Sequence, residues 1–217
     1  MRNPETGRAG QAARFLEWLT VATAEAQADA LRDDGLSLIE LAELACAYAE
    51  RAFERAGGPQ RAKSLDCRRG CDYCCHLPVE TSRAEASRAL EFARENLNAA
   101  EFRDLKHRIR EAAAAYPLSP QRPPAENPRC PFLEDSACRV YPARPLACRG
   151  WNSRDASACR SAHERGVSEV TVPVDSRIRG VFANASEALL RGLTHTQRDG
   201  PTHLVPALAA LIVLERG

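Results

Sequence analysis

Residues 67–76 read CRRGCDYCCH, which places four of the chain's nine cysteines, Cys67, Cys71, Cys74 and Cys75, in one short stretch. Thiolates are soft ligands that suit zinc, copper(I) and iron–sulfur clusters. The cysteines have helical spacing, but the residues between them, including Arg68 and Asp72, would make a poor core helix. The stretch therefore predicts an irregular metal-binding region and not a buried helix with inert thiols.

A second group of four cysteines lies further along, at Cys130, Cys138, Cys148 and Cys159. Four thiolates make one tetrahedral zinc site or hold one cubane cluster, so eight suffice for two sites. Adjacent Cys74 and Cys75 leave the backbone in different directions, which argues against both of them binding one small ion. The sequence leaves open how many sites there are and which cysteines share one. All eight are candidate metal ligands: Cys67, Cys71, Cys74, Cys75, Cys130, Cys138, Cys148 and Cys159.

The rest of the composition argues for metal binding in the cytoplasm. The amino terminus has no signal-peptide pattern, and no run of 18 apolar residues is present, so we expect neither secretion nor a membrane partner. Cytoplasmic thiols stay reduced, which favours metal binding or redox chemistry over structural disulfides. A net charge of +1 and 6% aromatic residues give no sign of nucleic-acid binding. Cys46 lies apart in an alanine-rich apolar stripe and is expected to pack in the core.

Apolar periodicity predicts a mostly α-helical fold. Phe15 to Ala26 fit one helical face, and Ser37 with Glu40 forms a capping box for a helix that ends at Gly57. Ser82 with Glu85 opens another helix. Further helices are expected around Phe102 to Ile109, after Asp175, and from about Thr202, with Pro206 tolerated in the first turns.

Little regular structure is expected around the second group of cysteines. Six prolines in residues 117–131 predict a loop. Phe132–Leu133 is expected to pair with Arg139–Tyr141 as one short β-hairpin, and residues 170–172 to form an extended piece. We therefore predict a single helical domain over residues 1–217 with an irregular Cys-rich metal-binding insertion. Within it lie a helical extension (1–60), the cysteine-cluster region (64–160) and C-terminal helices (170–217).

The cysteine pattern resembles the bacterial YkgJ-like cysteine-cluster family, which is described as a zinc- or iron-chelating domain. The resemblance covers residues 64–160 and rests on C67-x3-C71-x2-C74-C75, C130-P-F-L, C138-R-V-Y and R144-P-x2-C148-R-x-W151, with Cys159 as the trailing cysteine. It implies that the eight cysteines are the metal-binding set and that Arg144, Arg149 and Trp151 are signature residues without an assigned role. Some relatives are associated with lysine methylation of flagellin and with an iron–sulfur cluster. The shared cysteine motif alone does not transfer that activity.

Three functions follow from these residues. The first is a metal-binding protein that holds an iron–sulfur cluster, of [4Fe–4S] type, or Zn²⁺; the irregular spacing differs from the paired C-x2-C knuckles of zinc ribbons and favours iron–sulfur. The second is an iron–sulfur-dependent enzyme, such as a methyltransferase-like or redox enzyme, although no G-x-G-x-x-G follows a strand. The third is a zinc-stabilised module that binds a protein partner, with Trp151 as a candidate contact.

Overall fold

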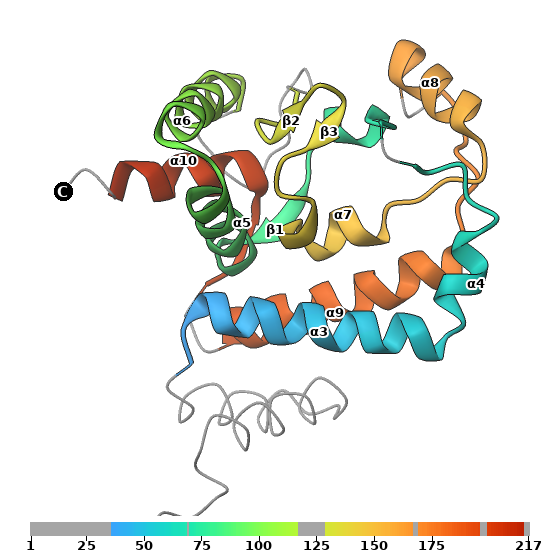
Figure 1. The fold of residues 1–217 in the computed structure, drawn as a ribbon. Coiled ribbons are helices and arrows are strands. Elements are labelled where there is room, and N and C mark those ends of the chain that lie inside the picture. The colour runs from blue at the N-terminus through green and yellow to red at the C-terminus, as the bar shows by residue number, and fades with distance from the viewer. Residues whose placement is uncertain (1–35, 69, 117–128, 167–168, 196–198, 215–217) are drawn as a thin grey trace, which may run out of the picture.

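A computed structural model describes residues 36–68, 70–116, 129–166, 169–195 and 199–214. As predicted, the chain is mostly α-helical (Figure 1). The helix expected at residues 15–26 and most of the proline-rich loop lie outside the described residues. The α-helices are α3 (Leu38–Arg55), α4 (Gly58–Ala62), α5 (Arg83–Asn96), α6 (Ala99–Ala114), α7 (Leu146–Gly150), α8 (Ala156–Arg165), α9 (Ser176–His195) and α10 (Leu204–Leu214). Single 3₁₀ turns are η2 (Tyr73–His76) and η3 (Tyr141–Ala143).

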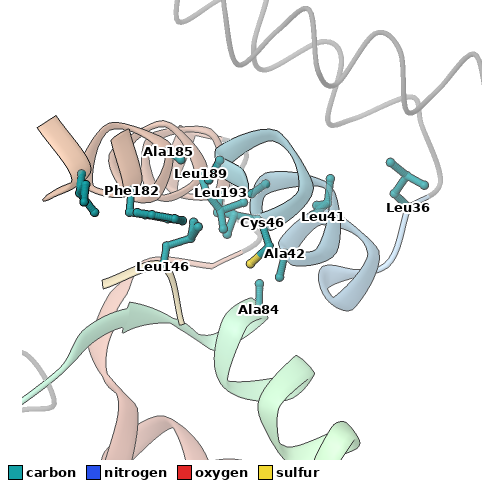
Figure 2. Close-up of a cluster of buried hydrophobic side chains, with 13 residues drawn as sticks. Leu36, Leu41, Ala42, Cys46, Ala84, Leu146, Phe182, Ala185, Leu189 and Leu193 are labelled. Atoms are coloured by element: carbon teal, nitrogen blue, oxygen red, sulfur yellow. The ribbon is translucent and has the colours of Figure 1, made fainter. Parts of the chain in front are cut away.

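One hydrophobic core forms where α3 and α9 run side by side and meet α5 and the start of α7 (Figures 1 and 2). The predicted capping box of Ser37 and Glu40 opens α3, and Gly57 follows the helix in the left-handed conformation that favours glycine. Cys46 is buried in this core, as its stripe predicts. The predicted face of α9, with Phe182 and Leu189, packs against α3.

A second core lies between α5, α6 and α10. Ala89 and Leu90 of α5, Leu105 of α6 and Leu208 of α10 are buried there. The Ser82–Glu85 capping box opens α5 as predicted, and α10 begins close to the expected position. Phe132, the largest fully buried side chain, joins this core from the cysteine region. The cysteine region is therefore anchored by apolar packing as well as by any metal.

Two short antiparallel sheets complete the fold. The predicted hairpin is present, but its strands are β2 (Leu133–Glu134) and β3 (Ala137–Cys138), so the return strand begins earlier than expected. Both turn residues, Asp135 and Ser136, have positive φ, which is typical of a two-residue hairpin turn. The second sheet pairs β1 (Glu80–Ser82) with β4 (Pro201–His203) and has no clear sequence signal. Such three-residue strands are set by their distant partner and not by local alternation.

The expectation of little regular structure around the second group of cysteines is wrong in part. Residues 146–165 contain α7 and α8, which are too short for apolar periodicity to reveal. Asp155 caps α8 by accepting hydrogen bonds from the Ser157 and Ala158 amides. Residues 170–172 form no strand. Among the described residues no helix has the length and hydropathy needed to cross a membrane.

Candidate metal centre

The first cysteine block is held in a compact turn. Cys74 and Cys75 lie in η2, where the Cys75 amide donates a hydrogen bond to the Asp72 carbonyl (2.8 Å). The Cys71 amide donates to the Arg68 carbonyl (3.0 Å). These local bonds form turns at Arg68 and at Asp72, which hold the backbone of Cys71, Cys74 and Cys75.

The second block is brought to the first by the backbone. The Cys130 amide donates to the Cys75 carbonyl at 2.8 Å, which joins the two blocks directly. Cys138 lies in β3 of the hairpin that follows Cys130, and Cys148 lies in α7. Cys159 lies in α8, which packs against η2. All four cysteines of the second block thus lie on elements arranged around the first.

Cys67 is bound to the segment between α7 and α8. The Ser153 amide donates to the Cys67 Sγ at 3.2 Å, and the Asp66 amide donates to the Ser153 carbonyl at 2.9 Å. The Ala156 amide, at the start of α8, donates to Asp66 Oδ2 at 3.0 Å. An amide directed at sulfur stabilises a thiolate, so Ser153 supports Cys67 as a ligand.

The thiols raise one another's pKa. A hydrogen bond between the Cys74 and Cys75 side chains, followed by burial, raises the pKa of Cys74. Burial is the largest cause of the raised pKa in five other thiols: Cys67, Cys71, Cys130, Cys138 and Cys148. The pKa of Cys130 is raised to about 12. Neighbouring cysteines add to each of these shifts. Such thiols stay protonated at neutral pH unless a cation replaces the protons, which is what a bound metal does.

Cys74 interacts electrostatically with cysteines of both sequence blocks. It is among the charges that raise the pKa of Cys67 and Cys71, together with Cys159. It is also among those that raise the pKa of Cys130, Cys138 and Cys148. The spatial grouping therefore crosses the two sequence blocks, with Cys159 near the start of the first block and the other three cysteines of the second block near its end.

Of the arginines near the cysteines, Arg144 faces the thiols. Its positive charge lowers the pKa of Cys74, Cys138 and Cys148 against the larger effect of their burial. The guanidinium lies 3.9 Å from the centre of the Tyr141 ring, and its buried Nε has no hydrogen-bond partner among the described residues. A thiolate–metal group carries negative charge, which this unpaired cation would offset.

The other signature residues have separate roles. Arg149 forms an ion pair with Glu50 of α3 and donates to the carbonyl oxygens of Pro142 and Arg144, so it fastens the η3–α7 turn to the first core. Trp151 follows α7 and lies under the guanidinium of Arg179 from α9. Neither side chain is placed as a metal ligand.

The thiols are gathered, but they are not closed around a site. Among the described residues, no three Cys, His, Asp or Glu side chains are already positioned to hold a metal ion. The donor set fits a thiophilic metal, because the clustered cysteines are less buried than Cys46 and have an amide and a cation near them.

A large cleft opens beside the cysteines. Its volume is about 1610 Å³, and six cysteines line it: Cys71, Cys74, Cys75, Cys130, Cys138 and Cys148. The facing wall comes from α9, including Arg179 and Leu190. Small-molecule sites usually occupy roughly 300–1000 Å³, so the cleft has room for a metal group and a ligand together.

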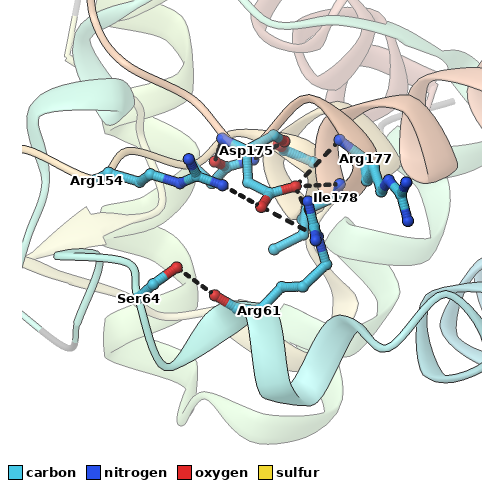
Figure 3. A network of polar contacts seen from close by, with 8 residues as sticks. Arg61, Ser64, Arg154, Asp175, Arg177 and Ile178 are labelled. Atoms are coloured by element: carbon cyan, nitrogen blue, oxygen red, sulfur yellow. Dashed lines mark hydrogen bonds and ion pairs between the residues drawn. The ribbon is translucent and has the colours of Figure 1, made fainter.

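Asp175 fixes the segments that carry the cysteines (Figure 3). It caps α9 by accepting from the Arg177 and Ile178 amides, each at 3.1 Å, as the sequence predicts for a cap at this position. It also pairs with Arg61 of α4 (3.1 Å) and Arg154 (2.6 Å). Arg61 precedes the first block and Arg154 lies between Cys148 and Cys159, so one buried carboxylate joins both blocks to α9. Sequence patterns gave the cap but no sign of these long-range ion pairs.

Two histidines, His76 and His163, lie close together beside the cysteines. His76, next to Cys75, has its ring centre 4.5 Å from that of His163 on α8. Burial, then His163, lowers the pKa of His76. His107 lies apart from them on α6, where it is exposed and 3.4 Å from Glu111.

A comparison with protein families identifies this region. Residues 66–166 match the CxxCxxCC family model, described as a "putative zinc- or iron-chelating domain". The cysteine region is similar to this family of chelating domains. It contains the eight clustered cysteines, and the sequence resemblance to a cysteine-cluster family is confirmed. No curated protein and no solved structure matches the chain.

Proposed function

We propose that the protein is a metal-chelating protein whose clustered cysteines hold an iron–sulfur cluster of [4Fe–4S] type. The observation that carries this proposal is that cysteines of both blocks line one cleft and that the blocks are joined by a backbone hydrogen bond. The ligands would be drawn from Cys67, Cys71, Cys74, Cys75, Cys130, Cys138, Cys148 and Cys159. When bound, such a cluster supplies one-electron redox chemistry.

The arrangement of the thiols supports a polynuclear group over a lone ion. A structural zinc site closes four thiolates at about 2.3 Å around one ion. Here six thiols are spread along an open wall, with no three gathered at one point within the described residues. Arg144, whose charge acts on three of these thiols, would offset the negative charge of either kind of metal group.

Zinc is the second candidate metal, because two separate sets of thiols interact electrostatically with Cys74. Cys67, Cys71 and Cys159 group with Cys74 on one side, while Cys130, Cys138 and Cys148 group with it on the other. Two zinc ions with a shared thiolate would satisfy this pattern.

The deciding experiment uses protein purified without air. Visible absorption, with iron, acid-labile sulfide and zinc measured per chain, separates the two candidates. Equal iron and sulfide with a broad visible band support the cluster. A colourless protein with one or two zinc ions per chain supports zinc binding and contradicts the cluster. A protein with neither metal contradicts both candidates.

Variants then test the ligand set. Cys71→Ser and Cys148→Ser should each lower metal content, because each removes a clustered thiol. Cys46→Ala is the matched control: its thiol is buried in the α3–α9 core, so this variant should lose stability but keep its metal. Full metal content in both serine variants would contradict the proposed ligands.

A further inference from the structure

Trp151 and Arg179 form a distinct feature of the cleft beside the cysteines. The guanidinium carbon of Arg179 lies 4.7 Å from the centre of the Trp151 ring, and both residues line the cleft. Arg179 belongs to the face of α9 that also brings Ala183 and Leu190 to the cleft, while the opposite face of the helix is buried in the first core. One face of α9 therefore packs in the first core, and the other face lines the cleft.

The charge of Arg179 is not neutralised within the described part of the chain. No carboxylate pairs with its guanidinium there, whereas Arg191, further along the same face, pairs with Glu187. Arg144 also lines the cleft, but its charge is directed at the thiols. A cation stacked on an aromatic ring at the edge of an apolar cleft is an arrangement that binds anions.

We propose that the cleft binds a small organic carboxylate, with its carboxylate on Arg179 and its apolar body along Trp151 and Ala183. A guanidinium matches a carboxylate with two parallel hydrogen bonds. A carboxylate carries one charge, which one arginine can balance. A phosphate monoester carries more charge and is usually bound by several cations or amides, and the cleft as a whole is lined mainly by apolar surface.

The site lies next to the metal-binding residues. Trp151 follows Cys148 by three residues at the end of α7, and both line the cleft. A carboxylate held on Arg179 would thus lie beside the metal centre without using any of its ligands. This inference goes beyond the proposed function, because it names a ligand class and holds for either metal.

The test compares matched probes and matched variants of the metal-loaded protein by isothermal titration calorimetry. The probes are 2-naphthoate and its neutral analogue 2-naphthamide. We expect 2-naphthoate to bind at least tenfold more tightly than 2-naphthamide, because a charge-assisted hydrogen bond contributes about this factor. Arg179→Gln should weaken 2-naphthoate binding about tenfold and leave 2-naphthamide unchanged, while Arg191→Gln should leave both unchanged.

Metal content is measured on each variant, so that loss of the ligand site is distinguished from loss of the metal. Equal binding of the two probes, equal effects of the two variants, or no 2-naphthoate binding by protein with its full metal content would overturn the proposal. None of these results tests whether the cysteines are metal ligands, because a wrong ligand assignment would appear only in the metal analysis.

Discussion

Arg144 and Arg139 lie close to the same cysteine, Cys138, yet their charges are used differently. The Arg139 guanidinium pairs with Glu101 at 2.8 Å and with Glu134 at 3.1 Å, whereas Arg144 faces the thiols without a carboxylate. Arg144→Gln should therefore weaken metal binding about tenfold, which is typical when a residue supporting a metal ligand is removed. Arg139→Gln is the matched control and should change metal affinity by less than about twofold. Competition with a chelator measures both, and equal effects would contradict the role given to Arg144.

Asp175 contributes stability that depends on pH. Burial raises its pKa, but hydrogen bonds from the Ile178 amide, Arg154 and Arg61 outweigh burial and lower the pKa to about 2. The unfolded value is about 3.9, so the stabilisation is complete above about pH 5 and is lost as the pH falls towards 2. Asp175→Asn keeps the cap but removes the ion pairs, and should lower the free energy of unfolding by about 2 kcal/mol at pH 7.

Urea unfolding at pH 7 and pH 3 checks this prediction. The difference between Asp175→Asn and the unchanged protein should be smaller at pH 3, while metal loss in acid affects both proteins alike. Asp104→Asn, an exposed carboxylate 3.8 Å from Arg103, is the control and should cost less than about 0.5 kcal/mol. A difference that is constant with pH would contradict the assigned ion pairs.

At the scale of elements, Glu85 couples α5 to α7. Its buried carboxylate accepts hydrogen bonds from the Ser82 amide (3.2 Å) and the Thr81 hydroxyl (3.0 Å), and from the Leu146 amide at the start of α7 (2.8 Å). Glu85→Gln replaces one accepting oxygen with a donor, so it should destabilise the protein by about 2–3 kcal/mol. Because α7 carries Cys148, metal affinity should fall as well.

The matched control for Glu85 is the same capping-box position in α6. Glu101→Gln alters an exposed box and an exposed ion pair with Arg139, and should cost clearly less than Glu85→Gln, since glutamine also fits this position. Thermal unfolding of both variants, with metal analysis, measures the difference. Equal destabilisation by the two substitutions would show that the contact with Leu146 adds nothing to the cap.

The elements also show where sequence reasoning succeeds and where it stops. The boxes at Ser37 and Ser82, the cap at Asp175 and the buried stripe around Cys46 are local patterns, and each is found in the structure. The β1–β4 sheet and the short helices α7 and α8 are fixed by partners distant in sequence. The candidate cysteines were identifiable because eight thiols outside an apolar stripe are unusual. Their crossed grouping around Cys74 was not, because it depends on how α8 packs against η2. The domain division, the cytoplasmic location and a protein partner stay predictions.

For the molecule as a whole, two hydrophobic cores are connected through α5, and the cysteine region joins both. Leu146 enters the first core, and Phe132 and Val140 enter the second. Because these cores bury long helices, and only Cys130 and Cys138 of the clustered cysteines pack against one of them, we expect the cores to remain folded when the metal is removed. This behaviour differs from that of a zinc finger, which unfolds entirely without metal.

Hydrogen exchange before and after chelation tests this division of stability. Removing the metal should increase exchange in residues 66–76 and 146–166, where thiols from both blocks lose their common ligand. Amides in α3, α5 and α9 should stay protected, and helical circular dichroism should fall only slightly. Adding the metal back should restore protection in the cysteine region. Loss of protection across α3 and α9 would mean that the metal stabilises the entire fold and that the two cores are too weak to persist alone.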